Sequence, residues 1–213
     1  MIENSLSKFG DYKTRIKKAI LALRLHQGVI LIDNKNRENE GDLVFSCEHM
    51  TVQQMALTIR YGSGIVCLCI TEDKRKKLNL PMMVKNNTST YHTGFTISIE
   101  SAHGVSTGVS ARDRLKTIKT AIPDDAKSDD FHKPGHIFPI CAHFGGLLSR
   151  PGHTEASITL MSISGFKPMS VICELTNKDG SMAQIKDIMK FSYLHNMPVL
   201  AINDLILYLN DNK

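Results

Sequence analysis

Residues 28–42, GVILIDNKNRENEGD, join a short apolar run to a strongly acidic loop. The run at 28–33 is rich in β-branched residues and has no polar residue before Asp33, which is typical of a strand buried on both faces. The loop at 34–42 is long for a compact domain, and loops of this length usually carry function. The stretch therefore predicts a core strand that ends where polar side chains gather.

Short apolar runs alternate with segments of helical periodicity along the rest of the chain. We expect further strands at residues 64–70, 95–100, 137–142, 170–175 and 198–202. We expect helices on a face carrying Ile16, Ile20 and Leu23, between Thr51 and Gly62, from Ser110 through Ile118, over 154–163, over 183–195 and after Asn203. Together these elements predict an α+β fold class, a single three-layer domain over residues 1–213 with a mixed β-sheet and helices packed on it.

Several residues predict local features of these elements. Gly28 is suited to cap the C-terminus of the first helix, and Thr154 is suited to cap the N-terminus of a later one. Pro139 has no N–H group, which places its strand best at a sheet edge or a bulge. Besides 34–42, long loops are expected at 80–94 and 123–135, the latter containing a polar surface loop with four Asp residues.

The composition restricts the class of protein. With 42% hydrophobic residues and 14 Gly among 213, the chain has a globular composition, which excludes disordered and collagen-like proteins. No apolar stretch approaches the roughly 18–20 residues that cross a bilayer, and residues 1–18 lack the apolar segment of a secretory signal. Five cysteines, an odd number, predict reduced thiols without a disulfide framework. We therefore expect a cytoplasmic protein that does not bind a membrane.

The formal net charge of +5 raises the alternative of a nucleic-acid-binding module. The basic residues cluster in the opening helix and at 74–77, and neither cluster is interleaved with aromatic residues. The chain has no Trp and no obvious platform for stacking bases. Solvated helix faces explain these clusters better, and we expect no nucleic-acid partner.

The acidic loop is the first segment whose residues could take part in catalysis or metal binding. The carboxylates of Asp33, Glu38, Glu40 and Asp42 lie within ten residues, together with Arg37. Alternating acids in a Gly-containing loop can direct several oxygens at one point, as hard divalent cations such as Mg²⁺ require. The spacing differs from that of an EF-hand, and a solvated acidic loop remains the alternative.

Residues 149–155, SRPGHTE, lead into a predicted helix. The free N–H groups of a first helical turn bind anions, and Arg150 adds a donor that suits phosphate. The alternative is an ordinary capped helix without a ligand. The segment shares its Pro-Gly-His sequence with residues 134–136, so His136 and His153 each follow a turn pair that projects a side chain from a loop end.

Glu174 lies at the C-terminal end of the apolar run 171–175. A carboxylate in that position is either a paired structural acid or a catalytic group with a raised pKa. The residues themselves leave both interpretations open.

Taken together, these segments resemble the 3,4-dihydroxy-2-butanone 4-phosphate synthase family of riboflavin biosynthesis. The resemblance extends over about residues 8–209. Its motifs are RENEGD at 37–42, MALTIRYGSG at 55–64, TGVSARDR at 107–114, PGHIFP at 134–139, RPGHTE at 150–155 and CEL at 173–175. Many relatives carry an additional GTP cyclohydrolase II domain, and we expect none in this chain.

The resemblance implies a lyase that converts D-ribulose 5-phosphate to L-3,4-dihydroxy-2-butanone 4-phosphate and formate. It implies a homodimer and the cofactor Mg²⁺, with two divalent ions in each site and with Mn²⁺ as a substitute. The reaction passes through an enediol and a skeletal rearrangement, and each stage moves a proton next to a carbonyl. A metal that polarises oxygens, flanked by acid and base groups, suits this chemistry.

The resemblance also implies roles for single residues. It makes Glu38 and His153 the metal ligands. It places catalytic groups at Asp33, Glu40, Cys67, His136 and Glu174. It places substrate contacts at Arg37, Glu38, Asp42, Thr107, Arg150, Pro151, Gly152, His153, Thr154 and Glu174, with Arg150 and Thr154 nearest the phosphate.

One alternative within enzymes is a pentose-phosphate isomerase. Such an enzyme would use the same substrate and the same enediol but would need no skeletal rearrangement. Release of formate distinguishes the two reactions.

Overall fold

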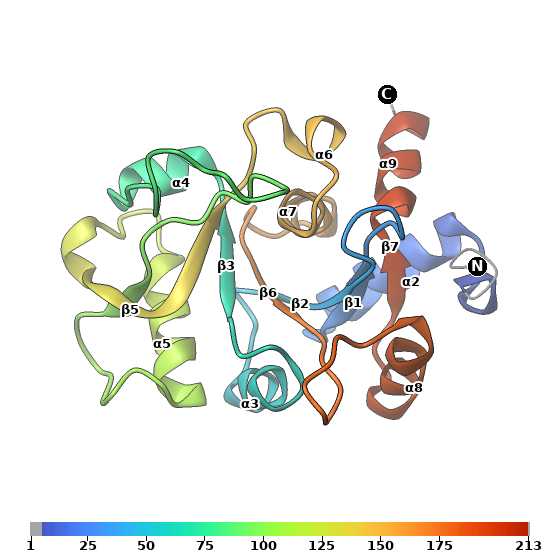
Figure 1. Ribbon diagram of the computed structural model, residues 1–213, viewed down its shortest axis with the longest axis horizontal. Coiled ribbons are helices and arrows are strands. Elements are labelled where there is room, and N and C mark those ends of the chain that lie inside the picture. The colour runs from blue at the N-terminus through green and yellow to red at the C-terminus, as the bar shows by residue number, and fades with distance from the viewer. Residues whose placement is uncertain (1–5, 213) are drawn as a thin grey trace.

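The computed structural model describes residues 6–212. Within this range, seven strands form one sheet in the order β4-β5-β3-β6-β2-β1-β7 (Figure 1). The pairs β1–β7 and β3–β5 run parallel and the other neighbours antiparallel, so the sheet is mixed, as predicted. The strands are β1 (Val29–Ile32), β2 (Gly41–Ser46), β3 (Cys67–Ile70), β4 (Ile99–Ser101), β5 (Phe131–Cys141), β6 (Ser170–Glu174) and β7 (Val199–Ala201).

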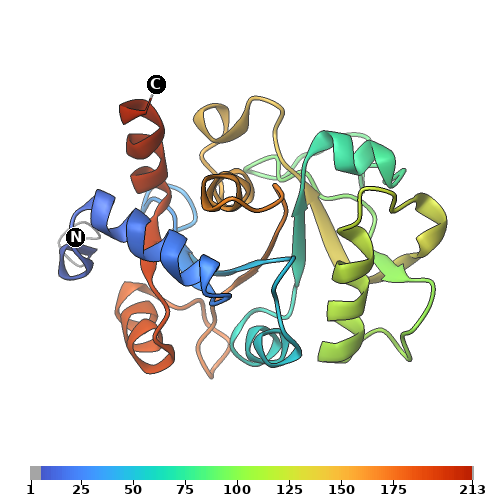
Figure 2. The same cartoon turned by 180° about the vertical axis from the view of Figure 1, so that it is seen from behind.

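Helices cover both faces of the sheet, which confirms the predicted single three-layer α+β domain (Figures 1 and 2). One face carries α2 (Tyr12–Arg24), α7 (His153–Ser164) and α9 (Ile202–Asp211). The other carries α3 (Val52–Tyr61), α5 (Ala111–Ala121) and α8 (Ile185–His195). The connections contain α4 (Glu72–Lys77), α6 (Gly146–Ser149) and the short 3₁₀ turns η1 (Ser7–Phe9) and η2 (Ser128–Asp130).

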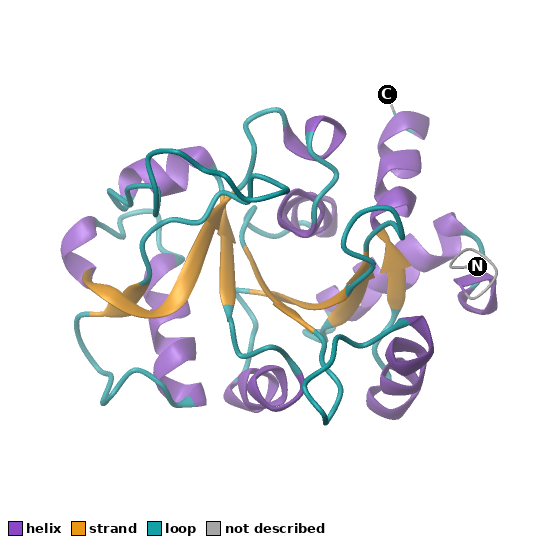
Figure 3. Cartoon of the chain, viewed as in Figure 1, coloured by secondary structure: helices purple, strands orange, loops and turns teal. Residues whose placement is uncertain are grey.

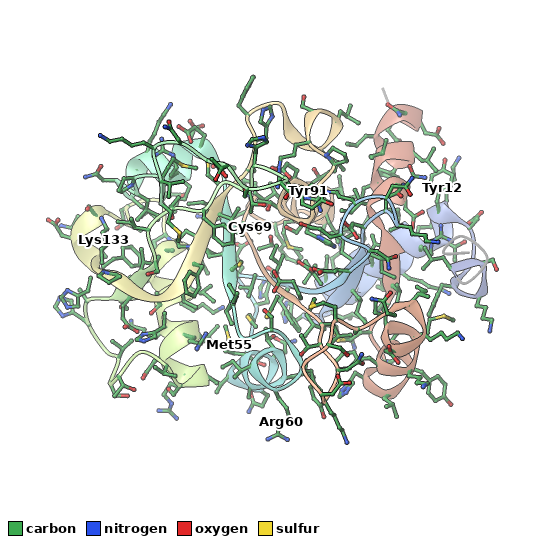
Figure 4. The ribbon with its side chains drawn as sticks, in the orientation of Figure 1. Tyr12, Met55, Arg60, Cys69, Tyr91 and Lys133 are labelled. Carbon is green, nitrogen blue, oxygen red and sulfur yellow. The ribbon has the colours of Figure 1, made fainter. Side chains whose placement is uncertain are left out.

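The strands form a continuous layer between the helices (Figure 3), and their alternation divides the core in two. Leu43 and Leu68 pack in the half that includes α3, whereas Val44 and Cys67 pack in the half that includes α7. Met55, buried in the first half, lies between α3 and the sheet (Figure 4). Because the central strands are buried on both faces, they read as uninterrupted apolar runs. Among residues 6–212, no helix is both long enough and apolar enough to span a bilayer.

The acidic loop is shorter than predicted, because β2 begins at Gly41 and includes Asp42. The expectation that 34–42 is entirely loop is wrong at this end, and β2 as a strand was not predicted. Gly and Asp have low strand propensity, but β2 pairs with both β1 and β6, and this tertiary pairing overrides the local preference.

The region around β5 also differs from the prediction. The strand starts at Phe131, so the expected surface loop over 124–134 ends earlier. Pro139 lies inside the sheet rather than at an edge, because β5 has β3 on one side and β4 on the other. Phe138 donates its N–H to Val66 beside β3, so the nitrogen of Pro139 faces the irregular segment before β4. Only the end of the strand expected at 95–100 is regular, and its pairing shifts register between Ile99 and Glu100.

Three predicted helix caps are wrong. Leu25 caps α2, and Gly28 is instead required because a Cβ there would overlap the Phe45 ring. Gly152 rather than Thr154 is the N-cap of α7, and Ala201 rather than Asn203 is the N-cap of α9. The chain therefore leaves α2 earlier, and enters α7 and α9 earlier, than the local capping preference indicated.

The two-sided core predicts a clear stability difference between two leucines. Leu68 is fully buried on β3, whereas Leu21 on α2 is 59% exposed. We expect Leu68→Ala to lower the free energy of unfolding by about 2–5 kcal/mol, because it leaves a cavity. The control Leu21→Ala should change it by less than about 0.5 kcal/mol. Urea denaturation followed by circular dichroism measures both, and equal effects would contradict the described core.

Candidate active site

Alternation along the strands puts several candidate residues on one face of the sheet. Val44 of β2 and Ile172 of β6 pack on the side of α7. Asp42 and Glu174 lie two residues away on the same strands and therefore face the same side. The register also pairs Asp42 directly with Glu174 on the neighbouring strand. The fold thus brings together two acids that are 132 positions apart in the sequence.

Asp33 organises the acidic loop from the end of β1. One carboxylate oxygen accepts the Glu40 N–H at 2.9 Å, and the other accepts the Glu38 N–H at 2.9 Å. The second oxygen also lies 3.1 Å from Arg37 Nη1. Asp33 is 2% exposed, and its carboxylate bends the loop back over the strand end. The side chains of Glu38 and Glu40 are held over the same face as a result.

His153 joins this loop from the first turn of α7. Its Nδ1 lies 3.5 Å from Glu38 Oε2, and its Nε2 lies 3.6 Å from Asp42 Oδ1 and 3.2 Å from the Leu31 carbonyl. One ligand atom each from Asp33, Glu38 and His153 lie within 4.8 Å of one another. This spacing suits a divalent cation, and it includes both residues predicted to bind metal.

The acidic cluster, defined as Asp33, Glu38, Glu40, Asp42 and Glu174, holds more negative charge than its surroundings neutralise. Burial raises the pKa of Asp42 well above its usual range against the opposing pull of His153, and Glu174 adds to the rise. Burial also raises the pKa of Glu40, with further contributions from Glu38 and Glu174. Oδ1 of Asp42 is buried and has no hydrogen-bond partner within residues 6–212. A cation at this point would relieve both the repulsion and the missing contact.

The two predicted metal ligands respond to their neighbours. Burial opposes the charged imidazole, but Asp42, the hydrogen bond to Glu38, and Asp33 outweigh it and raise the pKa of His153. Burial acts against ionised Glu38 as well, yet the hydrogen bond from His153 and the charge of Arg37 lower its pKa. Glu38 therefore keeps its negative charge over the whole neutral range.

Glu174 is held at the other side of the cluster by the segment after α3. Its Oε2 accepts the Ser63 hydroxyl at 2.6 Å, and its carbonyl accepts the Ser63 N–H at 2.8 Å. A Cβ at Gly62 would lie 2.5 Å from Cys173 Sγ, so only glycine lets this segment approach β6 so closely. Glu174 is thus positioned by the motif that contains Gly62 and Ser63, and it remains partly accessible.

Cys67 also lies on the α7 face, at the start of β3. The residue is 1% exposed, and its Sγ lies 3.5 Å from the Ile65 carbonyl oxygen. Burial and the charge of Glu174 raise the pKa of Cys67 well above its usual range. The thiol is therefore neutral beside the acidic cluster, where it can donate but is no ready nucleophile.

Arg150 is tied into the protein from several directions. Its Nη1 pairs with Glu155 Oε2 at 2.6 Å, and its Nε and Nη2 donate to the Tyr91 carbonyl at 3.2 and 3.1 Å. A Cβ at Gly152 would lie 2.5 Å from Nη1, so glycine lets the guanidinium cross the start of α7. Pro151, between them, is exposed.

The first turn of α7 offers unused donors. The N–H groups of His153, Thr154 and Glu155 have no acceptor within residues 6–212, and no side chain caps this end of the helix. Thr154 is 3% exposed and faces the interior beside them. Such a helix end attracts anions.

His136 and Thr107 lie away from the acidic cluster. Phe138 pairs with Cys67, which pairs in turn with Ile172. The segment before Cys67 leaves this register, because Gly62 rather than Gly64 bridges Leu175. The contact that His136 makes is with Glu100, at 2.9 Å. Thr107 is exposed in the turn before α5.

Tyr91 contributes contacts to the candidate site, and the sequence analysis did not identify it. It comes from the long 80–94 segment and lies beside the α7 region in Figure 4. Its hydroxyl donates to the Arg37 carbonyl at 2.7 Å, its ring lies 4.6 Å from the Arg37 guanidinium, and its own carbonyl accepts Arg150. The length of that loop was the signal that could have drawn attention to it. Ser63 and Glu100 were missed as well, and their partners Glu174 and His136 are distant in sequence. Glu155 was also missed, although its partner Arg150 lies only five positions away.

Comparison with known proteins agrees with this geometry. A family model described as 3,4-dihydroxy-2-butanone 4-phosphate synthase matches residues 17–208. The chain belongs to the 3,4-dihydroxy-2-butanone 4-phosphate synthase family. It is therefore an enzyme of riboflavin biosynthesis, and the predicted family is confirmed.

The similarity extends over almost the whole chain. The synthase of Buchnera aphidicola subsp. Acyrthosiphon pisum (strain Tuc7) is 67% identical over 211 residues, which cover 99% of this chain and 98% of that protein. The synthase of Cronobacter sakazakii (strain ATCC BAA-894) is 60% identical over 208 residues, covering 98% of this chain and 96% of that protein.

Solved structures share the fold. A crystal structure of the synthase in complex with two magnesium ions superposes with a TM-score of 0.87 at 32% identity, covering 92% of this chain and 96% of that one. The Candida albicans enzyme superposes with a TM-score of 0.83 at 38% identity, covering 91% and 96%.

The contacts of Tyr91 generate a prediction about the loop that contains Arg37. Tyr91→Phe removes the hydroxyl that holds the Arg37 carbonyl, a hydrogen bond worth about 1 kcal/mol. We expect the KM for the sugar phosphate to rise about fivefold, with the melting temperature nearly unchanged. Tyr193→Phe is the matched control, because Tyr193 is 88% exposed on α8. Identical KM values for the two variants would show that the loop does not depend on Tyr91.

Proposed function

We propose that this chain converts D-ribulose 5-phosphate to L-3,4-dihydroxy-2-butanone 4-phosphate and formate. The observation that carries the proposal is the convergence of the acidic cluster and His153 beneath the open N-terminus of α7. One end of this site offers carboxylates for proton transfer, and the other offers N–H donors for a phosphate. A short phosphorylated sugar fits that division of chemistry.

The residues present fit a divalent cation. Asp33, Glu38 and His153 would hold it, and the unpartnered Oδ1 of Asp42 supports positive charge nearby. When bound, such an ion polarises the hydroxyl and carbonyl oxygens of the substrate. Oxygen ligands favour Mg²⁺, and the imidazole makes Mn²⁺ an acceptable substitute. The number of carboxylates in the acidic cluster supports two ions in each site.

Proton transfer is assigned to groups that border the cluster. Glu174 is partly accessible and fixed by Ser63, which suits a general acid or base at the substrate carbons. Glu40 belongs to the same acidic cluster, and burial raises its pKa above that of an ordinary carboxyl, which favours a role in proton transfer. His136, on β5, serves the part of the substrate that extends toward that strand. Asp33 shapes the loop, and Cys67 lines the site as a neutral thiol.

The phosphate is assigned to the first turn of α7. The N–H groups of residues 153–155 and the hydroxyl of Thr154 provide donors, with Gly152 and Pro151 leading into the turn. Arg150 adds positive charge beside them, although its guanidinium already bonds Glu155 and Tyr91. Arg37 and Asp42 complete the proposed contacts around the sugar at the acidic cluster. Thr107, exposed in the turn before α5, stays a predicted substrate contact away from that cluster.

We also propose that the enzyme is a homodimer. Large apolar side chains remain exposed on the single chain, among them Phe144 at 92% and Leu194 at 77%. Light scattering coupled to gel filtration measures the assembly directly, and a mass near 24 kDa, that of one chain, would contradict it.

The reaction and its metal dependence are tested together. Incubation of the purified enzyme with D-ribulose 5-phosphate should release formate in equal amount to the four-carbon phosphate. Exhaustive chelation should abolish the release, and Mg²⁺ or Mn²⁺ should restore it. Conversion of the substrate without formate would indicate an isomerase, and full activity in verified metal-free enzyme would end the metal assignment.

The role of Arg150 can be separated from stability. Arg150→Ala removes a charged donor worth roughly 1.5–3 kcal/mol, so KM should rise about 10- to 150-fold. Because the residue also pairs with Glu155, the melting temperature must be measured for each variant. Arg60→Ala is the control, because Arg60 is exposed and points away from α3 in Figure 4. Unchanged kcat and KM in Arg150→Ala would contradict the phosphate assignment.

A further inference from the structure

His136 does not stand alone at the edge of the site. Its Nδ1 lies 2.9 Å from Oε2 of Glu100, which comes from the neighbouring strand β4. The side chain of Glu100 is 14% exposed, whereas that of His136 is 44% exposed. The imidazole is therefore accessible from one side and anchored by a carboxylate on the other.

Two glycines clear the space that Glu100 occupies. A Cβ at Gly108 would overlap the Glu100 carboxylate, and the φ of Gly108 is +82°, a conformation that favours glycine. A Cβ at Gly135 would overlap the backbone of Ile99 and Glu100. Gly108 belongs to the TGVSARDR motif and Gly135 to the PGHIFP motif. Both motifs thus converge on a residue that neither of them contains.

The start of α5 fixes the surroundings of the pair. Oδ2 of Asp113 accepts the Ser106 hydroxyl at 2.7 Å and the Gly108 N–H at 3.2 Å, which holds the turn against Glu100. Nη1 of Arg114 donates to the His136 carbonyl at 3.4 Å and to the Gly64 carbonyl at 3.1 Å. The backbone of His136 and the turn over Glu100 are therefore tied to the same helix end.

The chemistry of the contact determines how the imidazole is protonated. An ionised carboxylate only accepts hydrogen bonds, so the facing Nδ1 must carry the hydrogen. In the neutral ring, Nε2 is then left with its lone pair, free to take a proton from a substrate. The other oxygen of Glu100, Oε1, is buried without a hydrogen-bond partner in the described part of the chain. The imidazole, which contacts Oε2, is therefore the hydrogen-bond partner of this carboxylate among the described residues.

We propose that Glu100 is a positioning residue that holds His136 with Nδ1–H toward its carboxylate and Nε2 toward the substrate. This inference rests on the proposed function, in which His136 exchanges a proton during the reaction. Carboxylates that orient a catalytic imidazole act in this way in hydrolases, where loss of the charge allows the wrong tautomer. Glu100 itself does not touch the substrate.

The test compares Glu100→Gln and Glu100→Ala with the exposed control Asp129→Asn in η2. We expect kcat for formate release to fall about 10- to 100-fold in both Glu100 variants, the usual effect of losing an orienting partner, while KM changes less than threefold. The imidazole ¹⁵N shifts of His136 should move from the Nδ1–H tautomer toward Nε2–H. The control should match the wild-type protein in every measurement.

A double-mutant cycle with His136→Gln separates the proposals. If Glu100 acts through His136, then Glu100→Gln should have no further effect on kcat in the His136→Gln background. Wild-type kcat in His136→Gln would overturn the proposed role of His136 and, with it, the catalytic purpose of Glu100. A low kcat in His136→Gln combined with wild-type kcat and an unchanged tautomer in Glu100→Gln would overturn the positioning proposal alone. Melting temperatures identify any variant that fails to fold. If Glu100→Ala fails to fold, Glu100→Gln, which preserves the shape of the side chain, tests the positioning proposal.

Discussion

The carboxylate of Asp42 is buried next to His153, with Oδ1 3.6 Å from Nε2 and without a hydrogen bond within the described residues. Burying an acid in this way is costly unless positive charge lies nearby. Glu174, paired with Asp42 across the sheet, increases the cost. The surrounding arrangement follows from this constraint, because His153, Arg37 and the open helix end all bring positive potential to the same point.

The fold tolerates this charge because the rest of the sheet is apolar. Below the site, the α7 face of the sheet is filled by small and branched side chains such as Val44 and Ile172, and the opposite face has a separate core. The charged groups are confined to the ends of β1, β2 and β6 and to one helix terminus. The apolar packing of the rest of the sheet therefore offsets the repulsion within the site. Proteins usually compensate for an unfavourable functional site in this way, with stability from the surrounding scaffold.

The sequence predicted most of the fold because the central strands are continuous apolar runs and the helices have clear periodicity. It failed where pairing between distant segments decides the structure, as at Gly41 and Asp42, which become strand only because β1 and β6 lie on both sides. The α7 cap failed for a similar reason. Thr154 has a good capping side chain, but the bend at Gly152 is required by the crossing Arg150.

The candidate site likewise contains residues that the sequence could identify and residues that only the fold reveals. Glu38, Asp42 and His153 could be selected because acids and a histidine occur in recognisable motifs, and the structure brings them together. Residue patterns could not show which distant segments form one site, and the resemblance to a family provided that information. Ser63, Tyr91 and Glu100 carry no local signal, because a serine, a tyrosine or a glutamate becomes informative only through partners in distant parts of the chain.

The two Pro-Gly-His segments show how one local pattern serves different surroundings. In each, the glycine leaves out a Cβ where another part of the protein must pass: the β4 backbone at Gly135 and the Arg150 guanidinium at Gly152. The histidine that follows is then placed beside a different set of charges. His153 is enclosed by three acids and is buried, whereas His136 faces one carboxylate and solvent. The same three residues therefore lie inside strand β5 in one segment and at the start of helix α7 in the other, so the turn expected before His136 is not formed.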